Sequence, residues 1–306
     1  MPWLTGMFSV LWVSLSVYLI SSLLQLRKKS TAAVAALFGT AISVTLLNAT
    51  YNDKADLFTC AMLLALLGAC AVRRRRPGLG VLLCGGCLCL SMGLYQGYIE
   101  FAIGLLLLCM LRDCLTTNLP WKDYLCQGIT AIVGLLLGGV LYAASMKAVL
   151  AYKHLELIDS SNGLQQMSRA GVADYLARLP GAYKQVFTTL LGYDVWNNRG
   201  MRLATAVCLL LALACLVLIL RRKPRRALAQ TAILLVLLPL GLNVVYLLSE
   251  KAPTLLMLYP VYLVYALVLL LTGLEPDTIP RSAAWLACLL CAFITVQNVI
   301  YANGAY

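Results

Sequence analysis

The chain has 306 residues, of which 62% are hydrophobic and 12% charged, and its mean hydropathy is +0.87. A soluble domain cannot reach these values and still solvate its surface, so the composition excludes that class and predicts an all-α integral membrane protein. The formal net charge of +12 does not indicate a nucleic-acid partner, because the basic residues form short tracts beside apolar runs, where anionic membrane lipid lies.

Apolar runs long enough to cross a bilayer core of about 30 Å recur along the whole sequence. They predict about ten transmembrane helices in a single polytopic domain that covers residues 1–306. The predicted spans are 2–26, 32–50, 56–72, 79–94, 97–111, 125–150, 201–220, 227–248, 254–273 and 282–301.

Basic residues gather in every second connection between these spans. The five tracts are 27–29, 73–76, Arg112 with Lys122, 221–226, and Arg281. The positive-inside rule places them in the cytoplasm and both termini outside. The opposite connections hold most of the acids, namely Asp53, Asp56, Glu100, Glu156, Asp159, Asp174, Asp194 and Glu250. The acidic loops are therefore predicted to face the outside.

The segment 151–200, between spans six and seven, is the longest stretch that is not apolar throughout. Its apolar residues recur at spacings of three and four, and the pattern is interrupted at Pro180-Gly181. This predicts an external amphipathic loop of two short helices lying on the membrane interface. Packing of the apolar stripe onto the membrane domain explains the pattern equally well.

The first cluster of candidate functional residues lies between spans two and three and contains Asn52, Asp53 and Asp56. Asp53 or Asp56 can act as a general base that takes a proton from an acceptor hydroxyl, and Asn52 can bind the substrate. The alternative is a solvated turn in which Asp56 caps the third span.

The second cluster interrupts two apolar runs with Tyr95, Gln96, Tyr98 and Glu100. Aromatic rings with amide and carboxylate neighbours suit a sugar, so the first three are predicted to bind substrate. Glu100 is a third catalytic candidate, since an acid at the start of a membrane helix faces a cavity rather than lipid, which would cost about 3 kcal/mol.

Glycines at a spacing of four offer a simpler explanation for parts of the sequence. Gly93 and Gly97 flank the second cluster and would let another helix approach closely, with no ligand involved. Gly134 and Gly138 have the same spacing and predict a helix contact.

A phosphate leaving group would need a cation to stabilise its developing charge. The candidates are Lys153, Arg169, Arg199, Arg202 and Lys251, of which Lys153, Arg169 and Lys251 are predicted to bind substrate. Lys251 would equally serve as an interfacial anchor.

No metal site and no cofactor are predicted. The cysteines lie almost entirely inside apolar segments and read as small packing residues, and the single histidine, His154, has no partner at ligand spacing.

Four stretches of the chain resemble the bacterial membrane glucosyltransferases of the GtrII type. They are Pro-Trp-Leu-Thr-Gly at 2–6, Gly-Leu-Tyr-Gln-Gly at 93–97, Leu-Ile-Asp-Ser-Ser-Asn-Gly at 157–163, and the tyrosine-bearing stretches at 183–187 and 191–193. The Tyr-Gln turn is the most specific of the four. The resemblance implies a GT-C-like enzyme of the bacterial inner membrane. It would draw glucose from a polyprenyl-phosphate donor on the outer leaflet and pass it to a lipid-linked or surface glycan such as O-antigen.

One departure from the family concerns the catalytic acids. Members usually begin with a further membrane helix and an outer loop that bears paired acidic residues, and this sequence starts after that point. Either Asp53, Asp56 or Glu100 substitutes, or the chain is a truncated copy. Two alternative functions use the same polar cluster: a transporter or flippase for a lipid-linked glycan, and a polymerase of envelope polysaccharide.

Overall fold

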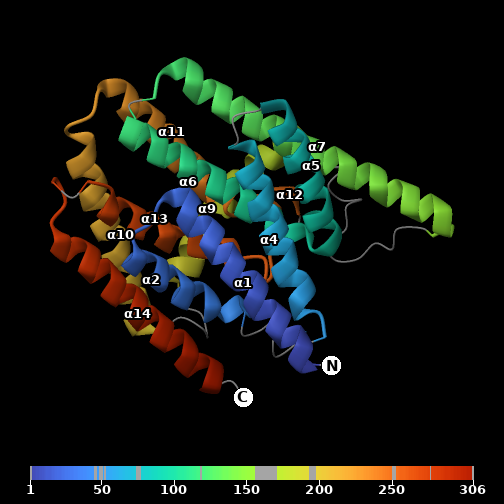
Figure 1. The fold of residues 1–306 in the computed structure, drawn as a ribbon, viewed down its shortest axis with the longest axis horizontal. Helices are drawn as coiled ribbons and strands as arrows, with labels where there is room; N and C mark the ends of the chain where they lie inside the picture. The colour runs from blue at the N-terminus through green and yellow to red at the C-terminus, as the bar shows by residue number, and fades with distance from the viewer. Residues whose placement is uncertain are drawn as a thin grey trace.

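The computed structural model describes residues 2–44, 47, 51, 53–73, 77–117, 119–155, 171–192, 198–249, 253–275 and 277–304. Every regular element in these ranges is helical, which confirms the all-α class (Figure 1). The elements are α1 (Pro2–Leu24), α2 (Lys28–Gly39), α4 (Ala55–Val72), α5 (Pro77–Leu94), η1 (Gln96–Tyr98), α6 (Ile99–Thr117), α7 (Trp121–Lys153), α9 (Val172–Leu191), α10 (Arg199–Leu220), α11 (Arg225–Gly241), α12 (Val244–Leu248), η2 (Tyr259–Tyr262), α13 (Leu263–Leu274) and α14 (Arg281–Gly304).

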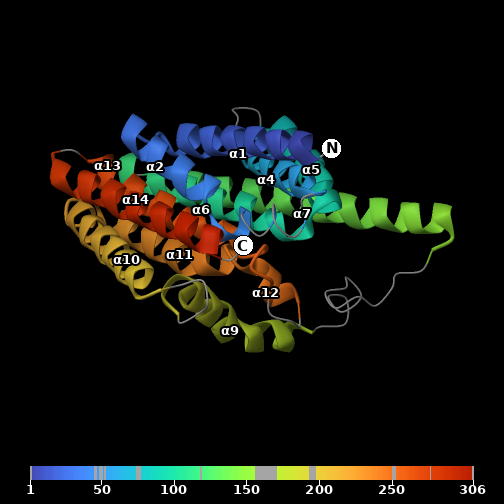
Figure 2. The same cartoon turned by 90° about the horizontal axis from the view of Figure 1, so that it is seen from below.

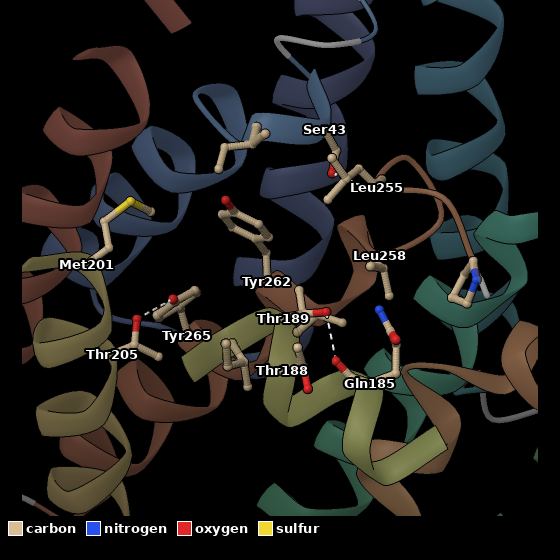
Figure 3. A pocket seen from close by; sticks show the side chains of 14 residues that line it. Ser43, Gln185, Thr188, Thr189, Met201, Thr205, Leu255, Leu258, Tyr262 and Tyr265 are labelled. Carbon is tan, nitrogen blue, oxygen red and sulfur yellow. Dashed lines mark hydrogen bonds between the residues drawn. The ribbon is translucent and has the colours of Figure 1, made fainter. Parts of the chain in front are cut away.

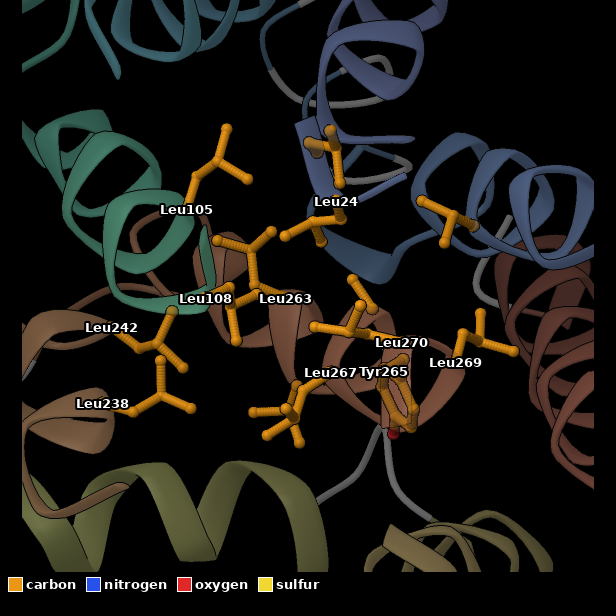
Figure 4. Close-up of a cluster of buried hydrophobic side chains, with 14 of the residues drawn as sticks. Leu24, Leu105, Leu108, Leu238, Leu242, Leu263, Tyr265, Leu267, Leu269 and Leu270 are labelled. Carbon is orange, nitrogen blue, oxygen red and sulfur yellow. The ribbon is translucent and has the colours of Figure 1, made fainter. Parts of the chain in front are cut away.

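Helix α13 forms the centre of the bundle. Ten consecutive residues, from Leu263 to Thr272, are buried, as expected of a helix that is apolar on every side. Leucines of α1, α6 and α11 close around it, among them Leu24, Leu105 and Leu238 (Figure 4). The other helices therefore pack around α13.

Among the described residues, five helices are long and apolar enough to cross a membrane by length and composition. They are Trp3–Leu24, Ala55–Val72, Trp121–Lys153, Arg199–Leu220 and Arg281–Ala302. They coincide with the first, third, sixth, seventh and tenth predicted spans. The chain is thus a helical protein with several candidate membrane spans, and the count of ten is not confirmed.

The prediction of a continuous helix is wrong at three of the other spans. In the second, α2 ends at Gly39, and its 12 residues reach only about 18 Å at ~1.5 Å per residue. The eighth is split between α11 and α12, and the ninth reaches only 12 residues of α-helix, in α13. Hydropathy adds up apolar residues and does not register such breaks.

The basic tracts gather at one end of the bundle, which we call the basic end. Arg73 of α4 and Arg112 of α6 both pair with Asp113. Lys223, which follows α10, pairs with Glu275, which follows α13, at 2.8 Å. In Figure 2 the C-terminus of α10 and the N-terminus of α14 lie at the same end, on the left.

The segment that was predicted to hold two short helices contains one continuous helix in its described part. Helix α9 runs from Val172 to Leu191 through Pro180, so the predicted interruption is wrong. Pro180 has no N–H to donate to the Leu176 carbonyl, so one hydrogen bond of the helix is missing. Both residues are exposed, so water or lipid headgroups can solvate that carbonyl. The opposite side of α9 packs on the bundle, where the Tyr183 hydroxyl donates to the Val236 carbonyl at 2.6 Å.

The predicted contact at Gly134 and Gly138 is confirmed. An added Cβ would lie 3.0 Å from the Cys84 sulfur at Gly134 and 2.6 Å from the Leu88 Cβ at Gly138. Helices α5 and α7 therefore approach closely only because these side chains are missing.

Gly138→Val is expected to destabilise the protein by about 1–3 kcal/mol, the usual cost of overpacking, because the Leu88 Cβ cannot move without its backbone. Gly139→Val is the matched control, since an added Cβ there meets nothing within 4 Å. Midpoints of detergent-induced unfolding measure both variants. Equal losses would show that helix propensity, rather than the contact with α5, explains the effect.

Candidate functional site

The Tyr-Gln turn joins α5 to α6 at the end of the bundle opposite the basic end. Tyr95 has an extended backbone that ends α5, and the Gln96 side-chain amide donates to the Tyr142 hydroxyl of α7 at 2.5 Å. An added Cβ at Gly97 would lie 3.0 Å from the Met257 Cγ, so the turn also abuts the segment 253–258. The turn is held between α7 and that segment.

The predicted close contact of Gly93 with another helix is wrong. An added Cβ at Gly93 meets nothing within 4 Å, and Gly97 meets Met257 and Tyr95 rather than a neighbouring membrane helix. Helix packing therefore does not account for this pair of glycines.

A row of aromatic side chains passes through the turn. Its members, in order, are Tyr51, Phe58, Tyr95, Tyr98, Tyr259, Tyr262 and Tyr265. Successive ring centroids are 6.1, 4.5, 4.7, 6.2, 6.0 and 5.7 Å apart, within the range of favourable aromatic pairs. This aromatic row connects the start of α4, where Asp53 and Asp56 lie, with the interior of the bundle.

Tyr98 and Glu100 are both fully buried. One Glu100 oxygen, Oε1, accepts a hydrogen bond from the Val245 backbone N–H at 2.7 Å. That N–H belongs to the first turn of α12, where a helix has free donors and attracts negative charge. The other oxygen, Oε2, and the Tyr98 hydroxyl have no hydrogen-bond partner within the described part of the chain. Glu100 is therefore buried beside residues 242–243, where the chain passes from α11 to α12.

Tyr95 lies at the edge of this interior and is half-buried. Burial raises the pKa of Tyr95 to about 12, and a hydrogen bond with the Thr254 side chain opposes part of that rise. Its phenol is therefore protonated at neutral pH and available as a hydrogen-bond donor.

Asp53 is exposed and Asp56 is partly exposed at the start of α4. The alternative in which Asp56 caps the helix is wrong in detail, because the N-cap is Lys54. Asp56 stands in the first turn, where its Oδ1 accepts from the Leu57 N–H at 2.9 Å. No hydrogen bond from the described part of the chain reaches its second carboxylate oxygen. Asn52 lies outside the described residues.

Among the described residues, the predicted cations are not brought together at the turn. Lys153 is exposed at the tip of α7, which extends well beyond the other helices (Figures 1 and 2), and its Nζ lies 5.6 Å from the Tyr152 ring centroid. Arg169 and Lys251 lie outside the described residues. Arg199 and Arg202 stand in the first turn of α10.

A cavity of about 220 Å³ lies between α9, α10, η2, α13 and the segment 253–258 (Figure 3). Its lining residues are Ile42, Ser43, Gln185, Thr188, Thr189, Leu190, Met201, Thr205, Pro253, Leu255, Leu258, Val261, Tyr262 and Tyr265. The aromatic row ends in it, at Tyr262 and Tyr265. Segment 253–258 separates the cavity from the Tyr-Gln turn, because Thr254 bonds Tyr95 while Leu255 lines the cavity.

Among the described residues that line this cavity, every polar side chain is uncharged. The Thr205 hydroxyl lies 2.9 Å from the Tyr265 hydroxyl, and the Ser43 hydroxyl donates to the Leu255 carbonyl at 2.8 Å. The Thr189 hydroxyl donates to the Gln185 carbonyl at 2.8 Å. Hydroxyls, an amide and tyrosine rings suit a neutral ligand with many hydroxyl groups, such as a sugar.

Sequence reasoning missed this cavity, and none of the predicted site residues that the structure describes lines it. Serine and threonine are common in membrane helices, where they bond to carbonyls of their own helix, so their positions carry no distinctive signal. Only folding brings α9 and α10 beside residues 42–43. Among the described residues, no three His, Cys, Asp or Glu side chains are grouped so as to hold a metal ion.

The comparison with protein-family models found one match, to the family described as glucosyl transferase GtrII, over residues 1–272. Searches of curated proteins and of solved structures found no match. The matched range contains the Tyr-Gln turn, the aromatic row and every residue that lines the cavity. It also covers most of the 306 residues, so the chain belongs to the GtrII family of membrane glucosyltransferases, whose reaction requires a sugar donor and a glycan acceptor.

Proposed function

We propose that this protein transfers glucose from a polyprenyl-phosphate donor to a lipid-linked or surface glycan such as O-antigen, in a GT-C-like manner, in the bacterial inner membrane. The observation that carries the proposal is the uncharged, hydroxyl-lined cavity beside the Tyr-Gln turn of a GtrII family member. The cavity binds the glucose unit, with the sugar ring against Tyr262 and Tyr265 and its hydroxyls near Thr188, Thr189 and Thr205.

The cavity lies at the N-terminal ends of α10 and α13, whereas the basic tracts follow the C-terminal ends of the same helices. If the basic end faces the cytoplasm, as the positive-inside rule predicts, the cavity opens toward the outer leaflet. A polyprenyl-phosphate sugar would present its glucose there, after its headgroup has crossed the membrane.

The donor phosphate needs a cation as the glycosidic bond breaks, and none of the described residues that line the cavity is cationic. Arg199 and Arg202 stand in the first turn of α10, next to Met201, which lines the cavity. We propose that Arg199 and Arg202, beside the cavity, bind the leaving phosphate. Lys153, Arg169 and Lys251 remain predicted substrate contacts, of which Lys153 stands apart at the tip of α7.

A general base must reach the acceptor hydroxyl, so the three predicted carboxylates are ranked by accessibility together with closeness to the Tyr-Gln turn. Asp56 is partly exposed in the helical turn that contains Phe58, whose ring lies 4.5 Å from that of Tyr95. Tyr95 in turn bonds Thr254, next to Leu255, which lines the cavity. Asp53 is exposed before the start of α4, and Glu100 is buried and accepts a hydrogen bond from the Val245 N–H. Asp56 is therefore the first candidate for the base.

The experiment that tests the proposal uses the purified protein in nanodiscs with polyprenyl-phosphoglucose labelled in the sugar and a lipid-linked O-antigen acceptor. Transfer of single glucose branches is the expected result. No transfer by the complete gene product would contradict the proposal. Movement of the intact donor across vesicles without transfer would point to a flippase, and growth of the glycan chain would point to a polymerase.

A conservative variant in the cavity sharpens this test. Thr189→Val is expected to raise KM for the donor about fivefold, as losing one hydrogen bond costs ~1 kcal/mol, with little change in stability. Thr130→Val is the matched control, because Thr130 bonds the Cys126 carbonyl of its own helix in the same way, is partly exposed on α7 and does not line the cavity. Equal KM values for the two variants would show that the donor does not bind in this cavity.

A further inference from the structure

A second cavity, of about 310 Å³, lies at the basic end, between the first turns of α2 and α14. Its lining residues are Arg27, Lys28, Lys29, Ser30, Arg281, Ala284, Trp285 and Cys288. Four of these eight residues are cationic and none is acidic. The glucosyl transfer proposed above makes no use of this cavity, which is at the other end of the bundle.

The four cations of this cavity, Arg27, Lys28, Lys29 and Arg281, form no ion pair with any acid that the structure describes. At the same end, by contrast, Asp113 neutralises Arg73 and Arg112, and Glu275 neutralises Lys223. Like charges around one cavity repel each other, so an anion between them would lower the free energy of the folded protein.

The backbone adds to this positive potential. Helices α2 and α14 both start at the cavity, and their first N–H groups carry the positive ends of the helix dipoles. The N-cap of α2, Arg27, makes no side-chain capping bond. Helix N-termini of this kind bind phosphate groups, and here two of them meet four cationic side chains.

Trp285 contacts one of the four cations and indicates where the cavity lies relative to the membrane surface. The Lys29 ammonium lies 3.4 Å from the centroid of the Trp285 ring, a close cation–π contact. Trp285 is 53% exposed, and a tryptophan with this exposure at the start of an apolar helix is typical of the membrane–water interface.

An exposed apolar stripe leads away from the cavity along α14. It consists of Leu286, Leu289, Phe293, Val296 and Ile300, which recur at spacings of three and four. An acyl chain can lie on such a stripe while its headgroup occupies the cavity, whereas a free phosphate ion would gain nothing from it. The stripe therefore favours a lipid as the source of the anion.

We propose that this cavity is a binding site for the phosphate of an anionic phospholipid headgroup, which neutralises Arg27, Lys28, Lys29 and Arg281 and joins α2 to α14. The site takes phosphatidylglycerol or a related anionic lipid and discriminates against zwitterionic phosphatidylcholine. The bound lipid stabilises the contact between the second and the last described helices of the fold.

Native mass spectrometry of the detergent-purified full chain measures the proposal directly, by titration with phosphatidylglycerol and with phosphatidylcholine. Phosphatidylglycerol is expected to bind at least tenfold more tightly. In the double variant Lys29→Gln with Arg281→Gln this preference is expected to fall by about tenfold. These side chains are exposed, and circular dichroism and size-exclusion chromatography verify that the variant is folded.

The matched control is Arg221→Gln with Arg225→Gln, which removes the same charge from exposed residues at the same end but outside the cavity. It is expected to keep the preference for phosphatidylglycerol. An equal loss of this preference in both double variants would show that only the total positive charge matters, and it would contradict a binding site in this cavity. Competition by excess inorganic phosphate that displaces the lipid completely would overturn the assignment to a lipid.

Discussion

Asp56→Asn is expected to lower kcat for glucosyl transfer by about 10²- to 10⁴-fold, the usual contribution of a positioned general base. The amide cannot take the proton of the acceptor hydroxyl, but its oxygen can still accept from the Leu57 N–H, so the start of α4 is preserved. The measurement is single-turnover transfer from labelled polyprenyl-phosphoglucose at saturating donor and acceptor.

Asp174→Asn is the matched control for this variant. Asp174 is also an acid in a first helical turn, and its carboxylate accepts from the Gly171 N–H at 2.7 Å, but it stands at the start of α9 and does not line the cavity. Its rate is expected to stay within a factor of two or so of the parent. A large loss in both variants would indicate a general effect of removing negative charge rather than loss of a base.

Two further variants decide among the carboxylates. Asp53→Asn removes the neighbouring exposed acid, and Glu100→Gln keeps an acceptor for the Val245 N–H while abolishing the carboxylate. Both are expected to retain most of the activity. If Asp56→Asn is active and Glu100→Gln is not, the base is Glu100, and α12 must move to admit the acceptor.

The fold class could be predicted from the sequence because composition alone requires a membrane protein and long apolar runs require helices. The helix breaks could not. Residues 39–40 end α2 and residues 242–243 separate α11 from α12 inside runs that remain apolar. At the second break, the buried Glu100 carboxylate, distant in sequence, pairs with a backbone N–H that the interruption leaves free. The hydropathy of residues near 242–243 cannot reveal that Glu100 lies beside them.

The candidate site divides in the same way. The Tyr-Gln turn could be predicted because polar residues between apolar runs are costly and so are conspicuous. The cavity could not, since Ser43, Gln185 and Thr205 come from three distant segments and each resembles an ordinary helix residue. The grouping of the basic tracts at one end was predictable, because those tracts flank helix ends and neighbouring helices run in opposite directions.

Asp113→Asn is expected to cost about 3 kcal/mol of folding free energy, the lower end of the range for breaking a buried ion pair. The lower end applies because the side chains of Arg73, Arg112 and Asp113 keep 18%, 14% and 10% of their surfaces exposed. Asp113 is the shared acid of two cations, one from α4 and one from α6. Its loss leaves both without a counter-charge in the interior of the basic end.

The neighbouring contacts make the effect cooperative. Arg73 also donates to the Gln127 side chain of α7 at 2.9 Å, and Arg112 donates to the Leu23 carbonyl at the end of α1. One carboxylate thus orients two guanidinium groups that connect four helices. Arg73→Gln combined with Asp113→Asn is expected to cost less than the sum of the single variants, because removing one cation relieves the repulsion that remains.

Detergent-induced unfolding midpoints of the four species in this cycle provide the measurement. Asp123→Asn is the control, since Asp123 is exposed in the first turn of α7 at the same end and its replacement changes the net charge equally. A loss of stability in Asp113→Asn no greater than in Asp123→Asn would contradict the role of the carboxylate. Strict additivity in the cycle would show that Arg73 and Asp113 act independently, and the connection between α4 and α6 would then rest on apolar packing alone.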